Sequence, residues 1–174
     1  MRKAILLVLA IAVAVGLYEF ARHNPAHSKA GGAPGAVGST AAAFNLQTID
    51  GKPFDLAAYS GKVVLLDFWA TWCVPCQAEI PHFVEFQDRY HGHGFQVLGI
   101  SMDDGPQPVQ AFYQKYKMNY PVAMGTARIA ESYGGILGLP VTFLIGRDGR
   151  IAAKYVGLTE TNKIQQKLEF LLKQ

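Results

Sequence analysis

Cys73 and Cys76 are the two cysteines of the chain, and two residues separate them. Thiols at this spacing can alternate between a dithiol and a disulfide, and the thiolate is the reactive form. An almost uninterrupted apolar run at residues 63–69 precedes them, which is typical of a buried parallel strand. Pro75 fits the first turn of a helix, where its missing N–H is harmless. The pair is therefore predicted at a strand-to-helix turn, with redox chemistry.

The two thiols are expected to have different roles. Cys73 falls at the predicted N-terminus of the helix, where unpaired backbone N–H groups and the helix dipole favour a thiolate. Cys76 lies one turn deeper and can attack the mixed disulfide that Cys73 forms, which releases the partner. Pro75 restricts how the loop between them flexes while the disulfide opens and closes.

Three further residues are candidates for the site. Asp67 is an acid within an apolar strand, where burial raises a carboxyl pKa, and it could take the proton of Cys76; the alternative is a structural aspartate bonded to the backbone. Glu79 follows Cys76 by three residues, so it shares a helix face and could disfavour the Cys76 thiolate; the alternative is an ordinary exposed glutamate. Pro140 directly precedes a predicted strand and is a candidate for a cis peptide bond.

The apolar patterns around these residues predict a single mixed α/β domain, a sheet sandwiched by helices. A hairpin is predicted at the start, and the helix that follows the cysteines is predicted to contain Ile80, Phe83 and Val84. The predicted strands are residues 44–49, 52–56, 63–69, 95–101, 120–124, 141–145 and 151–156, and the other predicted helices are residues 106–117, 126–133 and 160–173.

The basic charge of the chain lies in its N-terminal part. Residues 1–43 carry four Lys or Arg and one Glu, which leaves twelve residues of each sign in 44–174. A neutral domain without a basic patch argues against nucleic-acid binding.

The N-terminus predicts membrane targeting. Arg2 and Lys3 precede an uncharged run, so residues 1–20 are predicted as a membrane anchor or signal segment. An uncleaved anchor is favoured, with the domain on the periplasmic side of a bacterial inner membrane; secretion after signal cleavage is the alternative. Residues 21–43, rich in Ala and Gly, are predicted as a flexible linker to a domain at 44–174.

The run Asp67-Phe68-Trp69-Ala70-Thr71-Trp72-Cys73-Val74-Pro75-Cys76, with Leu139-Pro140-Val141-Thr142-Phe143-Leu144 downstream, resembles thioredoxin-fold proteins. More narrowly, it resembles the membrane-anchored, extracytoplasmic thiol:disulfide reductases of the TlpA/ResA/CcmG group. The similarity covers about residues 44–174. It implies a thioredoxin-like fold, with a central mixed β-sheet flanked by helices, an N-terminal β-hairpin and a central helix-strand insertion.

The same resemblance implies roles for individual residues. Cys73 would be the attacking thiol and Cys76 the resolving one, paired as a redox disulfide. Pro140 would be a cis proline that faces both, Glu79 a tuning acid, and Leu139 a backbone contact for the substrate chain. From their positions beside Cys73, Trp72 and Pro75 are expected on the rim that meets the substrate.

The residues between the cysteines favour a reducing couple. Val74 and Pro75 offer no side-chain donor that would stabilise a thiolate, and they differ from the Glu-Pro and Gly-Pro pairs of the resembling group. The expected substrates are oxidised protein cysteines, and the resemblance adds the haem-attachment Cys-x-x-Cys-His of apocytochromes c, and so cytochrome c biogenesis. A reductase in an oxidising compartment also needs a membrane electron donor of the CcdA or DsbD type. No cofactor is expected.

Two other classes remain as alternatives. A peroxiredoxin-like peroxidase needs Thr or Ser three residues before its cysteine, where this chain has Ala70. A copper or zinc chaperone could use both cysteines with His91 and His93, but a helix would place those imidazoles roughly 20 Å away. No metal site is predicted.

Overall fold

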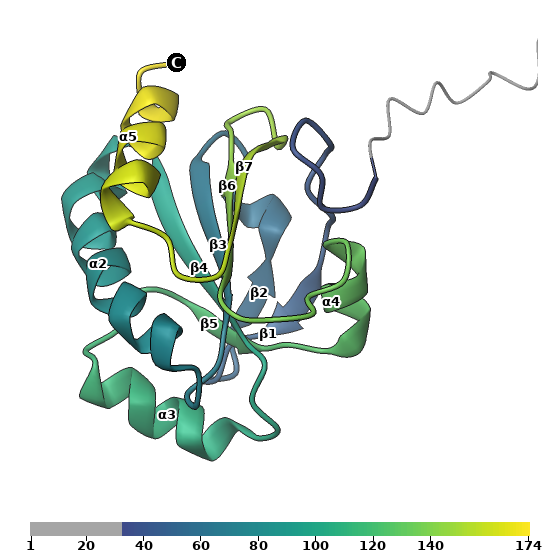
Figure 1. The fold of residues 1–174 in the computed structure, drawn as a ribbon, viewed down its shortest axis with the longest axis vertical. Coiled ribbons are helices and arrows are strands. Elements are labelled where there is room, and N and C mark those ends of the chain that lie inside the picture. The colour runs from purple at the N-terminus through teal and green to yellow at the C-terminus, as the bar shows by residue number, and fades with distance from the viewer. Residues whose placement is uncertain (1–32) are drawn as a thin grey trace, which may run out of the picture. The chain divides into compact units, whose positions relative to one another are not determined.

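The computed structural model describes residues 33–174, and its centre is a five-stranded mixed β-sheet (Figure 1). The strands lie in the order β5-β4-β3-β6-β7, with β3 parallel to β4 and antiparallel to β6. A separate two-stranded hairpin consists of β1 and β2. The strands are β1 (Asn45–Gln47), β2 (Pro53–Asp55), β3 (Val63–Trp69), β4 (Phe95–Ser101), β5 (Val122–Met124), β6 (Val141–Ile145) and β7 (Ile151–Val156).

Helices cover both faces of the sheet (Figure 1). α2 and α5 lie side by side on one face, while α4 and the β1–β2 hairpin lie on the other. The helices are α2 (Val74–Tyr90), α3 (Pro106–Lys115), α4 (Ala127–Ser132) and α5 (Thr161–Leu172), with short 3-10 turns η1 (Leu56–Tyr59) and η2 (His91–His93).

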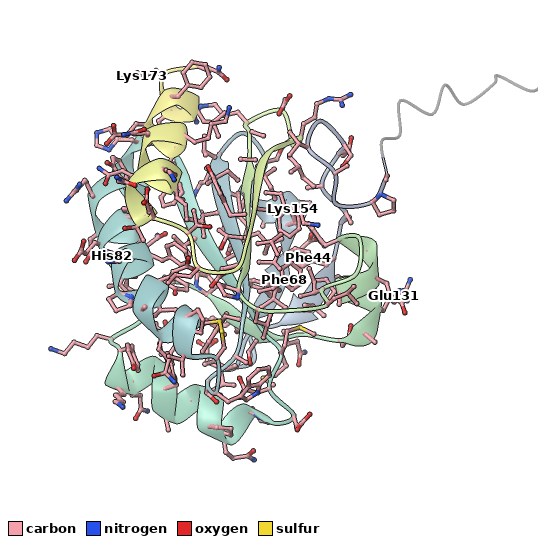
Figure 2. All side chains as sticks on the ribbon, in the orientation of Figure 1. Phe44, Phe68, His82, Glu131, Lys154 and Lys173 are labelled. Atoms are coloured by element: carbon pink, nitrogen blue, oxygen red, sulfur yellow. A yellow bond between two sulfur atoms is a disulfide. The ribbon has the colours of Figure 1, made fainter. Side chains whose placement is uncertain are left out.

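β3 is the central strand that leads to the cysteines, and every one of its residues is buried. Its successive side chains point to opposite faces of the sheet. Leu65 and Trp69 belong to the core that α2 and α5 cover, whereas Leu66 and Phe68 belong to the core beneath the hairpin and α4. Figure 2 shows Phe68 and Phe44 in this second core. The continuous apolar run of the sequence thus reflects two-sided burial, as predicted.

The predicted order of strands and helices is confirmed, and the differences lie at element ends. The helix predicted at 106–117 ends at Lys115, because Lys117 has a φ of 50°, which a right-handed helix does not contain. The strand predicted at 120–124 begins at Val122, after Pro121, which has no N–H for a sheet.

The linker predicted at residues 21–43 is wrong for its C-terminal part, residues 33–43. This segment pairs with the outer edge of β7, where Gly38 N–H donates to Ile151 O at 2.8 Å and Ile151 N–H donates to Ser39 O at 2.9 Å. Figure 1 shows the segment beside the turn between β6 and β7. The domain therefore begins before residue 44.

Small residues allow this segment to approach the domain closely. A Cβ atom at Gly35, whose φ is +70°, would lie 2.0 Å from Tyr133 O, so a larger residue would not fit. The Tyr133 hydroxyl donates to Ala42 O at 2.8 Å. Composition alone misled the linker prediction, because backbone hydrogen bonds and close approach order the segment without large apolar side chains.

The membrane segment predicted at 1–20, and the first part of the predicted linker, lie outside the described residues. Within residues 33–174, no helix is both long enough and apolar enough to span a bilayer.

Candidate active site

Cys73 and Cys76 form a disulfide at the start of α2, with an S–S distance of 2.03 Å (Figure 2). Cys73 is the N-cap of the helix, and its Sγ accepts a hydrogen bond from Cys76 N–H at 3.2 Å. Cys73 is 5% exposed and Cys76 1%. The predicted strand-to-helix position is confirmed, and the more exposed cysteine is the one that the helix N-terminus can stabilise as a thiolate.

The peptide bond between Leu139 and Pro140 is cis, as predicted. β6 runs antiparallel to β3, and Val141 pairs with Phe68, so Pro140 lies at the end of the sheet where β3 leads to Cys73. Pro140 is buried, and its carbonyl accepts Gly157 N–H at 2.8 Å. The predicted contact of the Leu139 backbone with a substrate chain remains a prediction.

Asp67 is 1% exposed and points to the same side of the sheet as Leu65 and Trp69, the side that α2 covers. Its Oδ1 accepts a hydrogen bond from the Thr142 hydroxyl at 3.1 Å, so its partner is a side chain and not the backbone. Burial, followed by the negative charge of Glu79, raises the pKa of Asp67 to about 8, and the Thr142 bond opposes this rise. The expected burial of Asp67 is confirmed; its role as proton acceptor remains a prediction.

Glu79 is 2% exposed, so the alternative of an ordinary surface glutamate is wrong. Its Oε1 accepts Thr159 N–H at 2.8 Å, and its Oε2 has no hydrogen-bond partner among the described residues. Burial raises the pKa of Glu79, while the Thr159 N–H and His82 lower it. One oxygen of this carboxylate is therefore buried without a hydrogen bond among the described residues, in the second turn of α2.

The raised pKa of Asp67 is close to that of a thiol. A free cysteine has a pKa of about 8.5, so a carboxyl with a pKa near 8 exchanges a proton with such a thiol at little free-energy cost. An ordinary aspartate would be too weak a base for this exchange. Burial of Asp67 beside a second buried acid is the physical cause of the match.

Asp103, which is not among the predicted site residues, contacts the loop before Cys73. α3 has Gly105 as its N-cap and no side-chain cap, so Asp103 and Asp104 do not cap it. Asp103 instead accepts hydrogen bonds from Thr71, in the short loop between β3 and Cys73. Because β3 and β4 are parallel, their C-terminal ends meet, and an acid just after β4 was a signal that could have revealed this contact.

Exposed apolar residues lie on three segments at the end of the sheet where β3 leads to the disulfide. Seven large apolar side chains are exposed among the described residues, and five belong to segments that meet at this end of the sheet. The segments are the loop and first turn at the cysteines, the loop before Pro140, and the end of β7 with the residues after it. The five residues are Trp72, Val74, Leu137, Val156 and Leu158. The exposure of Trp72 agrees with its predicted place on a rim, and its contact with substrate remains a prediction, as does that of Pro75.

Trp69 is fully buried and belongs to the core, as expected. His91 and His93 form η2 at the far end of α2 from the cysteines. His82 lies on the outer side of α2 (Figure 2). Across residues 33–174, no three or more His, Cys, Asp or Glu side chains gather in a way that could hold a metal ion.

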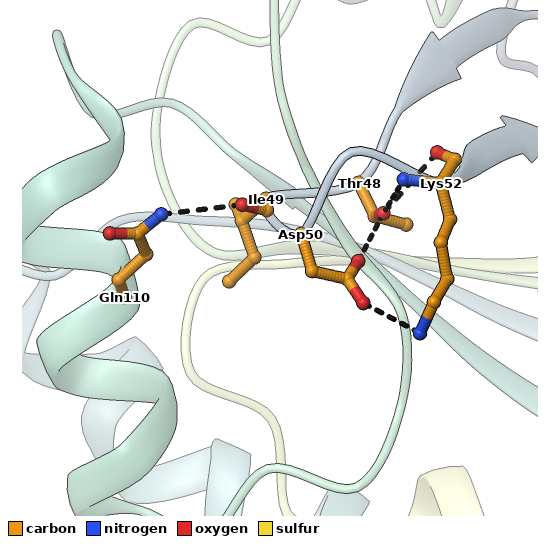
Figure 3. Close-up of polar contacts among 5 residues, drawn as sticks. All are labelled: Thr48, Ile49, Asp50, Lys52 and Gln110. Atoms are coloured by element: carbon orange, nitrogen blue, oxygen red, sulfur yellow. Dashed lines mark hydrogen bonds and ion pairs between the residues drawn. The ribbon is translucent and has the colours of Figure 1, made fainter.

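A cavity of about 520 Å³ lies away from the disulfide, between the turn after β1 and the α3–β5 segment. Several of its polar groups are paired: Lys52 with Asp50 at 2.7 Å, the Thr48 hydroxyl as donor to Asp50, and Gln110 Nε2 as donor to Ile49 O at 3.3 Å (Figure 3). The hydroxyl of Tyr120, which also lines the cavity, is buried with no hydrogen-bond partner among the described residues. Its lining contains no cysteine.

The chain resembles known proteins along nearly its whole length. A family model described as AhpC/TSA family matches residues 37–154. The thiol-disulfide oxidoreductase ResA of Geobacillus thermodenitrificans is 32% identical over 170 residues, or 97% of this chain and 93% of the relative. ResA of Bacillus cereus is 30% identical over 171 residues, with the same coverage of both chains.

Solved structures agree with these relatives. A thiol:disulfide interchange protein of the thioredoxin family from Chlorobium tepidum is 32% identical, with a TM-score of 0.72 over 76% of this chain and 95% of that chain. A putative thioredoxin from Neisseria meningitidis is 28% identical, with a TM-score of 0.70 over 76% and 89%. The predicted thioredoxin-like fold is confirmed.

Proposed function

The chain belongs to the AhpC/TSA family and is a thiol-disulfide oxidoreductase of the ResA type, and we propose that it reduces oxidised cysteines in protein substrates. The observation that carries the proposed direction is the pair of buried acids, Asp67 and Glu79, on the side of the sheet where Cys76 lies. A negative charge on either of these buried acids disfavours a thiolate nearby. A dithiol without a stabilised thiolate gives up its electrons readily, which makes the couple reducing.

The surroundings of Cys73 support the same direction. Among the described residues, the only hydrogen bond to its Sγ comes from Cys76 N–H. Strong oxidants owe their potential to additional stabilisation of the reduced thiolate. Val74 and Pro75 supply no such donor, and Val74 is directed to solvent.

Reduction of a substrate disulfide takes two thiol–disulfide exchange steps. The Cys73 thiolate attacks one sulfur of the substrate disulfide; that bond breaks, a mixed disulfide forms, and the other substrate sulfur leaves as a thiolate. Cys76 then gives its proton to Asp67 and attacks Cys73 Sγ, which releases the second substrate sulfur. The substrate gains two electrons, and the protein is left as the Cys73–Cys76 disulfide.

The exposed apolar residues at the disulfide end of the sheet support a polypeptide as the substrate. Trp72, Val74 and Leu137 are 66%, 74% and 101% exposed, which costs hydration free energy in the isolated protein and is repaid when a partner covers them. An extended chain that carries a disulfide presents such a partner surface. Within this class we assign the haem-attachment cysteines of apocytochromes c as the substrate, and the cis Pro140 loop with Leu139 as the contact for the substrate backbone.

The N-terminal pattern of the sequence supports a place outside the cytoplasm, on a bacterial inner membrane. In an oxidising compartment the Cys73–Cys76 disulfide must be reduced again after each turnover. A membrane electron donor of the CcdA or DsbD type would supply those electrons.

The direction is tested by the midpoint potential of the Cys73–Cys76 couple in glutathione and dithiothreitol buffers. We expect a potential closer to that of thioredoxin, about −270 mV, than to that of DsbA, about −120 mV. A midpoint potential near that of DsbA would overturn the proposal that the protein acts as a reductase.

The substrate is tested by trapping in cells with Cys76→Ala, which should retain the mixed disulfide on Cys73. Recovery of apocytochrome c supports the assignment. Adducts with many unrelated proteins indicate a general reductase and overturn the specific substrate, whereas adducts with none overturn the exchange mechanism. The matched control, Cys73→Ser with Cys76→Ala, should trap nothing.

A further inference from the structure

We propose that Asp103 is a positioning residue for the thiol exchange: it fixes the loop that delivers Cys73 to the helix N-terminus when the disulfide is open. This inference deepens the proposed function, because it concerns the same two thiols. It depends on the exchange chemistry and not on the direction or the substrate.

The contacts of Asp103 define a clamp on Thr71. The Thr71 backbone N–H donates to Asp103 Oδ2 at 2.9 Å, and the Thr71 hydroxyl donates to Oδ1 at 2.5 Å. The Ser101 hydroxyl also donates to Oδ2, at 2.8 Å. Both carboxylate oxygens are thus engaged by one residue, which fixes the position of Thr71 as well as its orientation.

The clamp continues into the helix that carries the cysteines. Gln77 Nε2 donates to Thr71 O at 2.8 Å, so both backbone polar groups of Thr71 are held from outside the loop. The Tyr116 hydroxyl, just after α3, lies 3.4 Å from Gln77 Oε1. Asp103 therefore stands at one end of a polar chain that joins the end of β4, the loop and the second turn of α2.

The position of this loop explains why the clamp concerns the chemistry. Only Ala70, Thr71 and Trp72 separate the end of β3 from Cys73, and Cys73 N–H bonds back to Ala70 O at 3.2 Å. Cys73 receives its stabilising N–H from Cys76 only while it occupies the N-cap position. A movement of Thr71 would therefore displace Cys73 from the N-cap position.

The clamp has a larger role in the dithiol than in the disulfide. In the oxidised protein the S–S bond itself holds Cys73 against Cys76. Reduction removes this bond, and the hydrogen bonds to Asp103 then remain to keep Cys73 at the helix N-terminus. Loss of the clamp should therefore disorder the reduced site while leaving the oxidised site in place.

The test compares four full-length proteins: the unaltered chain, Asp103→Ala, Asp103→Asn, and Asp104→Ala as the matched control. Asp104 is the adjacent acid; it is exposed, and no described residue bonds to its side chain. The readouts are the rate of Cys73 alkylation by iodoacetamide against pH, measured on the reduced protein, and the melting temperatures of both redox forms.

We expect Asp103→Ala to slow alkylation at pH 7 by about tenfold, the factor equivalent to one net hydrogen bond, and to move its pH profile upward. Asp103→Ala should lower the melting temperature of the reduced form more than that of the oxidised form. Asp103→Asn keeps an oxygen that accepts from Thr71 N–H and should recover most of the rate. Asp104→Ala should match the unaltered chain.

The proposal is overturned if Asp103→Ala lowers both melting temperatures equally and leaves the alkylation profile unchanged, which would describe a merely structural residue. It is also overturned if Asp103→Asn behaves like Asp103→Ala, since charge and not hydrogen bonding would then be responsible. Alkylation uses no substrate and no electron donor, so neither outcome depends on whether the protein is a reductase. The midpoint potential of the unaltered chain decides that question separately.

Discussion

The disulfide end of the sheet and the cavity near the β1–β2 turn differ in the exposure of their charged side chains. At the cavity, Asp50 and Lys52 pair with each other and are exposed, so water solvates both charges (Figure 3). Near the disulfide, Glu79 is buried with one oxygen unpartnered, and Asp67 is buried with a raised pKa. The region with the cavity is thus expected to be the less reactive one, because reactivity here comes from the burial of ionisable groups and not from volume.

The largest expected effect is on the rate of disulfide reduction, which should depend on the disulfide end of the sheet and not on the cavity. Cys73→Ser removes the attacking thiolate, so reduction of a peptide disulfide should fall by at least about 10³-fold, to the uncatalysed rate. Lys52→Ala in the cavity should leave the rate unchanged. The assay follows release of peptide thiols under excess reductant. If Cys73→Ser kept a tenth of the activity, the reaction would have to take place at a group other than this disulfide.

The second-largest expected effect concerns the buried Asp67 and the way in which the stability of the fold depends on pH. The pKa of Asp67 is about 8 in the folded protein and 3.8 for an ordinary aspartate. Between these values the unfolded chain releases a proton that the folded chain retains, so ionisation increasingly favours unfolding as the pH rises. Asp67→Asn removes this penalty, and we expect it to stabilise the fold by up to about 5 kcal/mol at pH 8 and by almost nothing at pH 4.

Urea unfolding of the oxidised protein at the two pH values measures this difference. Asp104→Asn, at an exposed acid, is the control and should show no such pH dependence. An Asp67→Asn protein stabilised equally at pH 4 and pH 8 would show that packing, and not the ionisation of a buried carboxyl, is responsible.

A smaller effect tests the coupling between the two buried acids. The charge of Glu79 contributes to the raised pKa of Asp67, so Glu79→Gln should lower that pKa. More Asp67 is then ionised at pH 7, and the resolving step should become faster by less than about tenfold, since roughly one tenth is already ionised when the pKa is about 8. The measurement is the pH–rate profile for decay of a mixed disulfide on Cys73.

Glu85→Gln is the matched control, because Glu85 is an exposed acid on the same helix. Its profile should coincide with that of the unaltered chain. A profile that moves to higher pH in Glu79→Gln would mean that Glu79 acts as the proton acceptor itself, and that its coupling to Asp67 is secondary.

The sequence predicted the parts of this site that follow from local order. Cys73, Cys76 and Pro75 mark a helix start, and an acid within an apolar strand marks a buried carboxyl, so the burial of Asp67 could be expected. The burial of Glu79 could not be decided, because it depends on Thr159, which comes from a loop eighty residues further along the chain. The clamp of Asp103 on Thr71 likewise depends on two strands meeting in parallel register.

The smallest expected effect tests whether the cavity region is as inert as its pairing indicates. Lys52 and Asp50 are exposed, so water solvates whichever charge is left when its partner is removed, and an exposed ion pair contributes little. Lys52→Ala should therefore leave both the melting temperature and the rate of disulfide reduction within experimental error. If Lys52→Ala slowed reduction of a protein substrate while reduction of a short peptide disulfide stayed unchanged, the cavity would belong to the binding surface for large partners. The contrast between the two regions would then hold for chemistry but not for recognition.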